Sequence, residues 1–334
     1  MGPRLAFPRL TALILLCLVG NILMAAGPVL AQEKVAYRLK WLINASTAGD
    51  VFALDQGLFS RQGLEVAVKA GGPERDAVRE LELGYAQFGV ASADQVIRAL
   101  AKGASVFVLA QLFQVNPLQW IYRADDFTLS RIQDLAGRTV GITYGGNDET
   151  IMRALLATVD MDEHQVRLAS VRYDYTPFFQ NQVTIWPVYR NTQGLILSDK
   201  LAVGGERVAF FDPSEHGVRF VANSVVTSKK MMDDHPQTVG RFTRALLAGW
   251  QAAMAPANES AVIRAVSQYD RDTSEAVMRR QLTVTRQMIQ PDPDIPIGHI
   301  DTTAWHQTEQ IMISQKLIPG PVNVIGRLNT KLSP

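Results

Sequence analysis

The runs LKWLINASTAGDVFALDQGLFSRQGLEV (residues 39–66), VKAGGP (68–73) and YAQFGVASAD (85–94) decide the fold of this chain. In each run a β-rich segment ends, and small or hydrogen-bonding residues lead into a helix-forming segment. Such junctions place backbone N–H groups and short polar side chains at the carboxyl edge of a parallel sheet. Open α/β sheets hold small ligands at this edge, so the stretch predicts ligand capture.

Apolar β-rich runs alternate with amphipathic segments through the first two thirds of the chain, which predicts an α/β fold with mostly parallel sheets. The expected strands are residues 35–41, 64–70, 88–91, 106–113, 120–123, 139–143, 166–171, 183–188, 208–212 and 218–228. Beyond them we expect helices only, from Pro236 to Met254 and over 259–268, 274–288 and 302–317.

Three helix starts carry recognisable cap residues. Ser92 with Gln95 and Ser130 with Gln133 have the spacing of a capping box, in which each side chain accepts a hydrogen bond from the backbone N–H of the other residue. Asn147 follows two glycines and is expected to cap the next helix.

The first 31 residues predict a cleaved signal peptide. A basic start with Arg4 and Arg9 precedes an apolar run that is interrupted and shorter than the ~20 residues that span a bilayer, and cleavage is expected after Ala31. A retained membrane anchor is the alternative. Cys17 is the single cysteine, and Leu16 before it is not the small residue that a lipoprotein signal needs. We therefore expect a periplasmic protein without thiol, disulfide or lipid.

The composition indicates a globular chain with balanced charge. With 334 residues, of which 47% are hydrophobic, the chain can bury a sizeable core, and its length suggests about two domains. Removing Arg4 and Arg9, and no acidic residue, takes the formal charge from +1 to −1. So balanced a charge argues against a nucleic-acid partner.

The order of these motifs resembles the periplasmic substrate-binding proteins of ABC importers, specifically the group that captures thiamine pyrimidine precursors and their relatives. The marks are Lys40-Trp41, Ala48-Gly49, residues 57–66, Gly71-Gly72-Pro73, Phe88-Gly89-Val90, residues 134–142, Gly145-Gly146-Asn147 and Thr176-Pro177-Phe178. The resemblance implies a two-lobed fold of type II, with mixed, mostly parallel sheets flanked by helices and a ligand cleft between the lobes. Lobe one is expected over 32–117 and 222–334, and lobe two over 118–221.

The resemblance and the strand-end positions together give the candidate ligand-binding residues. In lobe one they are Trp41, Asn44, Thr47, Gly72, Ser92 and Asp94. In lobe two and on the return crossing they are Gly145, Gly146, Asn147, Asp174, Tyr175, Tyr189 and Asn223. Most of them also have an ordinary structural explanation: Trp41 as a core residue, Asn44, Thr47, Ser92 and Asn147 as helix caps, Asp94 as a first-turn residue stabilised by the helix dipole, the glycines as turns, and Asp174 as a solvated turn.

The sequence gives little support to an enzyme. Its five histidines are scattered without metal-ligand spacing, and it has no nucleophile elbow, Walker loop or dinucleotide fingerprint. Eukaryotic pyrimidine synthases share the expected fold but use a cysteine-rich iron motif, and no cysteine lies outside residues 1–31. We expect neither a cofactor nor a metal.

We therefore expect a monomeric binding protein that holds a small aromatic nitrogen heterocycle and delivers it to the permease of an ABC transporter. A thiamine-pyrimidine-forming enzyme and a ligand-presenting sensory module are the alternatives, and riboflavin or a sulfonate are alternative ligands. Trp186 is a further candidate for filling the cleft.

The charge of the expected cleft points to a donor-rich ligand. Its loops carry Asp50, Asp94, Asp148 and Asp174 and hardly any Lys or Arg. Carboxylates accept hydrogen bonds from amino groups and repel anions in a desolvated site. We therefore expect aminopyrimidines to bind and sulfonates not to bind.

Overall fold

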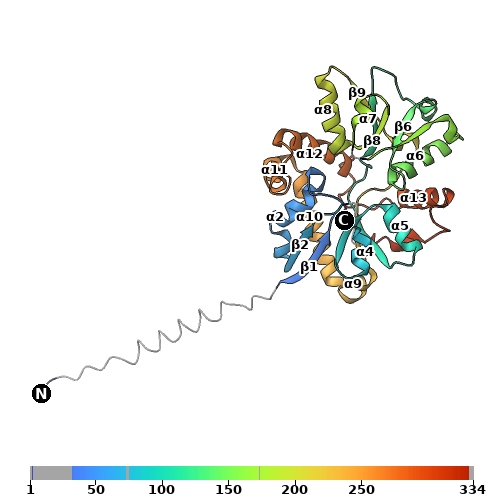
Figure 1. Cartoon of the computed structure of the whole chain (residues 1–334). Helices are drawn as coiled ribbons and strands as arrows, with labels where there is room; N and C mark the ends of the chain where they lie inside the picture. The colour runs from blue at the N-terminus through green and yellow to red at the C-terminus, as the bar shows by residue number, and fades with distance from the viewer. Residues whose placement is uncertain (1, 3–31, 73–74, 173, 331–334) are drawn as a thin grey trace.

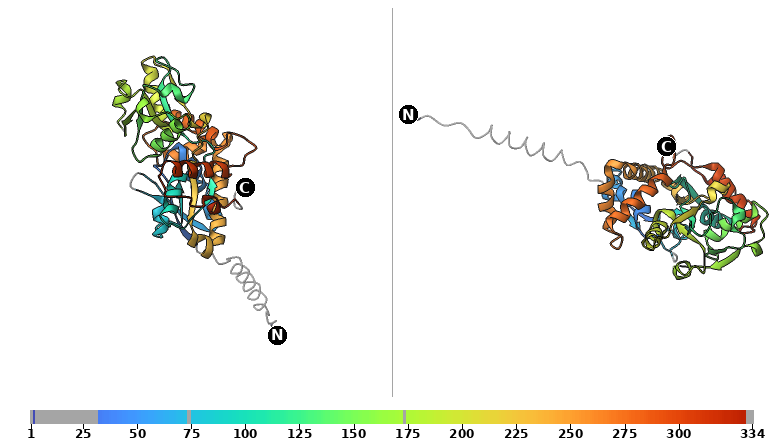
Figure 2. Two further views of the ribbon diagram at one scale, coloured as in Figure 1. Left: turned by 90° about the vertical axis from the view of Figure 1, so that its right-hand side faces the viewer. Right: turned by 90° about the horizontal axis from the view of Figure 1, so that it is seen from above.

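The computed structural model describes residue 2 and residues 32–330, apart from 73, 74 and 173. These residues form two α/β lobes, one above the other, which Figures 1 and 2 show as an elongated molecule. The expected cleavage site after Ala31 and the turn residue Pro73 lie outside the described residues. Within the described part, no helix combines the length and apolar character needed to cross a membrane.

The first sheet has the strand order β2-β1-β3-β10-β4. β1 is parallel to both β2 and β3, whereas β10 is antiparallel to both β3 and β4. Four strands therefore share one direction and β10 runs against them. The bounds are β1 Glu33–Arg38, β2 Leu64–Lys69, β3 Phe88–Ala91, β4 Val106–Gln111 and β10 Ser224–Ser228.

The second sheet repeats this arrangement with the order β7-β6-β8-β5-β9. β6 is parallel to both β7 and β8, and β5 is antiparallel to both β8 and β9. Here β5 is the strand that opposes the other four. The bounds are β5 Leu118–Arg123, β6 Thr139–Ile142, β7 Arg167–Ser170, β8 Ile185–Tyr189 and β9 Val208–Phe211.

Two crossing segments connect the sheets, between β4 and β5 and between β9 and β10. The side-chain amide of Asn116 on the outward segment donates a 2.8 Å hydrogen bond to the carbonyl of Phe220 on the return segment. The Asn116 side-chain oxygen also accepts from the Leu118 N–H at 2.9 Å, just before β5 begins. We propose that the lobe boundaries lie within these segments, at 117/118 and 221/222.

Helices cover the faces of both sheets (Figure 1). Around the first sheet are α2 Ala48–Asp55, α3 Leu58–Arg61, α4 Ala77–Glu82, α5 Ala93–Ala101, α9 Lys229–Asp234, α10 Pro236–Met254 and α11 Glu259–Ser267. The second sheet carries α6 Asn147–Ala157, α7 Thr176–Phe179 and α8 Leu195–Val203. α12 Glu275–Ile289 and α13 Thr302–Ser314 complete the chain's helices in the described residues, together with short turns such as η1 Ala45–Thr47 and η4 Arg190–Gly194.

The expected strands and C-terminal helices are all present, with small shifts at most of their ends, but the strand expected over 218–228 begins only at Ser224. β1 ends at Arg38, so Trp41 lies in the loop beyond the strand rather than at its last position. The capping box of Ser92 and Gln95 is confirmed. The one expected for Ser130 and Gln133 is wrong, because Asp134 accepts from the Ser130 N–H instead.

Lobe one is held together by a close crossing of α2 and α10. A Cβ added at Gly49 would lie 2.0 Å from the Trp250 ring, and one added at Gly249 would lie 2.3 Å from the Cβ of Ala53. Glycine at both positions therefore lets the two helix backbones approach closely. The Ala48-Gly49 motif, one of the marks of the family resemblance, serves this packing.

Asp50 lies inside this helix crossing and not at the cleft. Its side chain is 2% exposed. Its Oδ1 accepts hydrogen bonds from the Tyr37 hydroxyl at 2.7 Å and the Trp250 indole N–H at 3.2 Å. Burial raises the pKa of Asp50 to about 7, against the lowering effect of these two donors. The expectation that Asp50 adds negative charge to the cleft is therefore wrong.

This buried carboxyl group makes the stability of the protein depend on pH. Because its pKa rises from 3.8 to about 7 on folding, the native state binds more protons than the unfolded state between these values. The free energy of unfolding therefore falls as the pH rises through this window, and the loss is constant above about pH 7. Asp50→Asn should remove this component, since an amide oxygen can still accept from Tyr37 and Trp250.

Urea unfolding at about pH 5 and pH 8 measures the effect, and we expect a smaller decrease in the free energy of unfolding for Asp50→Asn than for the parent protein. Asp55→Asn is the matched control, because Asp55 is an exposed carboxylate at the end of the same helix. An equal pH dependence in the parent and Asp50→Asn would contradict the assignment.

Candidate functional site

The candidate site lies where the helices α5 and α6 begin, each at the carboxyl end of a sheet. Ser92 precedes α5 in lobe one, and Asn147 is the first residue of α6 in lobe two. The Asn147 side-chain amide donates to the Ser92 hydroxyl at 3.4 Å, although the two residues are 55 positions apart. Two of the predicted residues therefore meet across the interface between the lobes.

Asp94 extends this contact within lobe one. The Ser92 hydroxyl donates a 2.5 Å hydrogen bond to Asp94 Oδ1, and both side chains are buried. Ser92 also takes part in the capping box with Gln95, so its position is fixed by the start of α5. Within the described residues, the one hydrogen bond to the Asp94 carboxylate uses Oδ1, so Oδ2 can accept from another group.

Asp148 and Tyr189 contribute the corresponding groups of lobe two. Asp148 Oδ2 accepts from the Thr143 N–H at 2.6 Å, and burial raises the pKa of this carboxyl group. Tyr189 is the last residue of β8. Burial, and then the charges of Asp148 and Asp94, raise its pKa to about 12. The Tyr189 phenol therefore stays protonated at physiological pH and is a hydrogen-bond donor to any ligand oxygen beside it.

Lys40 is a functional candidate that the sequence interpretation missed. Arg38, two residues earlier, pairs with Gly89 of the neighbouring strand β3, and β3 leads directly into Ser92 and Asp94. Burial lowers the pKa of Lys40, and the Asp94 carboxylate opposes that shift. The available signal was its place beside Trp41, immediately after a strand that ends at the same sheet edge.

We call these side chains the interlobe cluster: Lys40, Ser92, Asp94, Asn147, Asp148 and Tyr189. They come from both lobes and from the ends of neighbouring parallel strands. The cluster holds an ammonium group, two carboxyl groups, a phenol, a hydroxyl and an amide. It can therefore bind a polar ligand through both donors and acceptors.

Glycines shape the loops around the cluster. The Gly71 N–H donates to the Trp41 carbonyl at 2.8 Å, and a Cβ at Gly71 would lie 2.2 Å from the Leu39 carbonyl oxygen. The backbone at Gly71 therefore lies close to the loop that carries Lys40. Gly72 has a φ of +152° and lies partly exposed.

The loop before α6 depends on glycine in a similar way. Gly145 has a φ of +81°, which favours glycine, and its N–H donates to Glu149 at 2.7 Å. Gly146 is the cap residue, so the expectation that Asn147 caps the helix is off by one position. A Cβ at Gly146 would lie 2.4 Å from Asp148 Oδ1. The absence of a side chain at Gly146 therefore leaves room for the Asp148 carboxylate.

Two predicted residues of lobe one are occupied by local hydrogen bonds. The Asn44 side-chain oxygen accepts from the Ser46 N–H at 2.8 Å, and the Thr47 hydroxyl donates to the Asn44 carbonyl at 2.9 Å. They cap the short helix η1, which lies against η4 of lobe two and against α12. Trp41 is partly exposed in the loop between β1 and η1.

The remaining predicted residues, Asp174, Tyr175 and Asn223, each make contacts within their own part of the fold. Asp174 is exposed, and its carboxylate accepts from the Thr176 N–H at 2.9 Å, which lowers its pKa. Tyr175 packs on Trp186 with ring centroids 5.7 Å apart. Asn223 lies on the return crossing, where its carbonyl accepts from the Leu112 N–H at 3.0 Å.

Trp186 does not fill the cleft. It is 1% exposed and belongs to an apolar core of lobe two that includes Ile121, Phe178 and Leu197. The idea that it replaces a ligand is wrong. Among the described residues, no group of three or more His, Cys, Asp or Glu side chains is placed to hold a metal ion.

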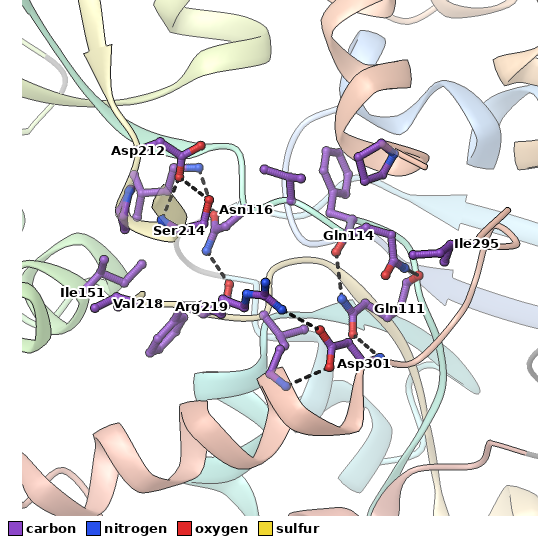
Figure 3. Close-up of a pocket in the computed structure, with 18 residues that line it drawn as sticks. Gln111, Gln114, Asn116, Ile151, Asp212, Ser214, Val218, Arg219, Ile295 and Asp301 are labelled. Carbon is purple, nitrogen blue, oxygen red and sulfur yellow. Dashed lines mark hydrogen bonds and ion pairs between the residues drawn. The ribbon is translucent and has the colours of Figure 1, made fainter. Parts of the chain in front are cut away.

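A cavity of about 290 Å³ lies at the crossing segments, and none of the predicted ligand-binding residues lines it. Its walls come from both crossing segments, α6, the loop after α12 and the start of α13. Figure 3 shows Arg219 directed toward Asp301, whose nearest atoms are 3.9 Å apart, and Ser214 beside Asp212. The cavity and the predicted polar side chains therefore lie at different places. We place the candidate site at the interlobe cluster, where polar groups of both lobes converge.

A family model described as NMT1/THI5 like matches residues 44–260 of the chain. A protein named for thiamine biosynthesis in Haemophilus influenzae is 25% identical over 62% of this chain and 65% of its own length, just under two thirds. The formylaminopyrimidine-binding protein of Halalkalibacterium halodurans is 20% identical over 87% of this chain and 88% of that protein. The riboflavin-binding protein RibY of Chloroflexus aurantiacus is 23% identical over 90% of this chain and 85% of that protein.

Solved structures show the same fold at lower identity. The periplasmic aliphatic sulphonate-binding protein SsuA of Escherichia coli has a TM-score of 0.70 at 15% identity, over 88% of this chain and 91% of that chain. The desulfurization enzyme DSZB has a TM-score of 0.58 at 14% identity, over 90% of this chain and 97% of that chain. The expected two-lobed periplasmic-binding-protein fold is confirmed, and it is a fold that binding proteins and an enzyme share.

The contact between Gly146 and Asp148 can be tested without any ligand. Gly146→Ala should displace the Asp148 carboxylate and lower the free energy of unfolding by about 1–3 kcal/mol, since the added methyl group has no room beside Asp148 and the Thr143 carbonyl. Gly320→Ala is the control, because a Cβ there meets nothing within 4 Å. Urea unfolding of both variants makes the comparison, and equal stability of the two would show that Gly146 is not needed for the placement of Asp148.

Proposed function

The chain belongs to the NMT1/THI5-like family, and from this premise we propose that it is an extracytoplasmic solute-binding protein that captures a small aromatic nitrogen heterocycle for an ABC importer. Two relatives that match most of its length are named for binding formylaminopyrimidine and riboflavin. Both ligands contain a nitrogen heterocycle. The proposed role requires no bond to be made or broken.

The observation that carries the proposal is the hydrogen bond between Asn147 and Ser92, 3.4 Å long, at the junction of the two lobes. A binding protein of this kind closes on its ligand by moving rigid lobes about a hinge, and closure is favoured by contacts from both sides. Here each lobe contributes a helix start, polar side chains and at least one carboxyl group to the same cluster. The Asn116 bond to Phe220 holds the two crossing segments together at the hinge.

The proposal is tested by weighing the protein with its ligand. We expect native mass spectrometry of protein purified without denaturation to show a monomer with a single small organic ligand. Incubation with pyridoxal phosphate and iron should yield no pyrimidine product. Pyrimidine formation under these conditions would favour the pyrimidine-forming enzyme instead. Neighbouring genes that encode a sensor kinase in place of a permease would favour a sensory module.

Asp94 offers a specific test of ligand recognition. If its carboxylate accepts a ligand N–H, Asp94→Ala should weaken heterocycle binding by roughly 1–3 kcal/mol, because the ligand donor is then buried without a partner. Isothermal titration calorimetry measures this difference. Asp55→Ala is the control, because Asp55 is an exposed carboxylate at the end of α2 and is not a candidate ligand-binding residue. Unchanged affinity in Asp94→Ala would remove this residue from the site.

We further propose that alkanesulfonates do not bind, although the fold resembles SsuA. The interlobe cluster has two carboxyl groups against one ammonium group, and an anion in such a desolvated site meets like charge. Calorimetry with an alkanesulfonate and the parent protein decides the point. Tight binding would contradict the charge argument and leave the binding-protein role intact.

We propose that the protein is secreted to the periplasm through a cleaved signal peptide. Cleavage after Ala31 would make Gln32 the first residue of the secreted chain. Intact-mass measurement of the periplasmic fraction should give this species without an acyl group. A lipid-bearing species that starts at Cys17 would contradict the proposal.

A further inference from the structure

The helix α12 contacts both lobes, and Figure 1 shows it between α11 and α8. Its apolar face, which includes Leu282 and Ile289, belongs to the buried core around the first sheet. Glu259 of α11 accepts hydrogen bonds from two arginines of α12 at 3.0 and 2.8 Å. At the end of the helix, the Met288 carbonyl accepts from the Gln114 N–H of the outward crossing segment at 2.9 Å. α12 is therefore fixed to lobe one and to one of the crossing segments.

A second face of α12 is polar and meets lobe two. Gln281 and Thr285 lie one turn apart on this face, and both are buried. The side-chain amide of Asn191, in η4 of lobe two, donates a 3.0 Å hydrogen bond to the Thr285 hydroxyl, 94 positions away. The Thr285 hydroxyl donates its own proton to the Gln281 carbonyl at 2.8 Å. The bond from Asn191 is therefore a buried side-chain contact between the two lobes.

An ion pair adds to this contact at the other end of α12. Arg280 Nη1 lies 2.8 and 2.6 Å from the two carboxylate oxygens of Asp199 on α8. The two side chains are 50% and 43% exposed. An ion pair as exposed as this contributes little and is screened by salt. The buried bond between Asn191 and Thr285 is therefore the main attractive contact of this face with lobe two.

Two buried oxygens act against the same contact. Asn191 Oδ1 and Gln281 Oε1 are both shielded from solvent, and within the described residues neither has a hydrogen-bond partner. A buried acceptor that has lost its bond to water costs about as much as one good hydrogen bond adds. Attraction and cost at this face are therefore of similar size, unlike at the apolar face of α12. Polar interfaces of this kind are typical of domains that move relative to each other.

Resting on the proposed function, we propose that the polar face of α12 is a reversible clamp between the lobes, and that Asn191 and Thr285 are positioning residues for ligand capture. When α12 and η4 separate, Asn191 Oδ1 and Gln281 Oε1 return to water. When they join, Tyr189 is brought to lobe one, because η4 is a single π-helical turn that directly follows it. The clamp therefore sets the fraction of molecules with joined lobes, and the apparent ligand affinity scales with that fraction.

The clamp predicts opposite shifts for two variants of the same helix face. Thr285→Val removes the acceptor of the Asn191 amide and should separate the lobes. Gln281→Met removes an unpaired buried oxygen and should join them. Small-angle X-ray scattering of each variant, freed of co-purified ligand by partial unfolding and refolding, measures the radius of gyration. We expect a larger radius for Thr285→Val than for Gln281→Met, and equal radii or the reverse order would overturn the inference.

The same helix offers a matched control for each variant. Thr283→Val and Gln287→Met change exposed residues of α12 and should leave the radius of the parent protein unchanged. Thr283, like Thr285, donates to the carbonyl four positions earlier, at 2.9 Å, so the two valine variants differ in the contact with lobe two. Thermal unfolding shows whether each variant is folded, and Thr285→Ala takes the place of Thr285→Val if that variant is not.

Ligand affinity gives a second readout. Calorimetry with riboflavin and with 4-amino-2-methylpyrimidine should show that Thr285→Val weakens whichever compound the parent protein binds by roughly tenfold, because fewer molecules have joined lobes. Gln281→Met should strengthen the binding of the same compound. Weaker binding by Gln281→Met than by Gln287→Met would contradict the clamp.

The outcomes distinguish the clamp from the proposed function. If a heterocycle binds and the radii of Thr285→Val and Gln281→Met are equal, the clamp is wrong and the binding-protein role stands. If neither heterocycle binds the parent protein, the proposed function is wrong. The scattering comparison needs no ligand, so it decides in that case as well whether α12 joins the lobes.

Discussion

The common direction of four strands in each sheet is the constraint on which the candidate site depends. Because β1 and β3 end at the same edge of the first sheet, Lys40 and Asp94 become neighbours although they are far apart in sequence. The same holds for β6 and β8, which bring Asp148 and Tyr189 together in lobe two. The helix starts that follow these strands need caps in any case, and the polar caps Ser92 and Asn147 then meet across the lobes.

The strands and the C-terminal helices could be predicted from the sequence because each follows from a local pattern, whereas the two-lobed fold was implied by the resemblance to a known family. Alternating apolar runs place a strand within a few residues, and Pro236 marks the start of α10. The helix starts at Ser92 and near Asn147 were equally readable. What joins those two residues is the arrangement of two lobes, and its detail could not be read from either segment alone.

The rest of the site depends on which way side chains point, and sequence patterns say little about this. From the sequence, Asp50 was expected at the cleft. In the structure its carboxylate accepts a hydrogen bond from the indole of Trp250, 200 positions away. The backbone of Lys40 lies close to Gly71, which belongs to the loop after another strand. Both cases are long-range contacts, and they decide whether a charge lies in the core of a lobe or at the ligand.

The position of β10 has a consequence for the order in which the molecule can be built during synthesis. β10 lies between β3 and β4 and pairs with both, yet it is made only after all of lobe two. Until Ser224–Ser228 leaves the ribosome, β3 and β4 each lack a neighbour, and the first sheet is divided into two pieces. Pairing across so long a stretch of chain is slow, because the entropy of closing the loop is lost before the contacts form. The nascent chain therefore stays incompletely folded while most of it is translated, which is the state in which a polypeptide can be threaded through a membrane channel.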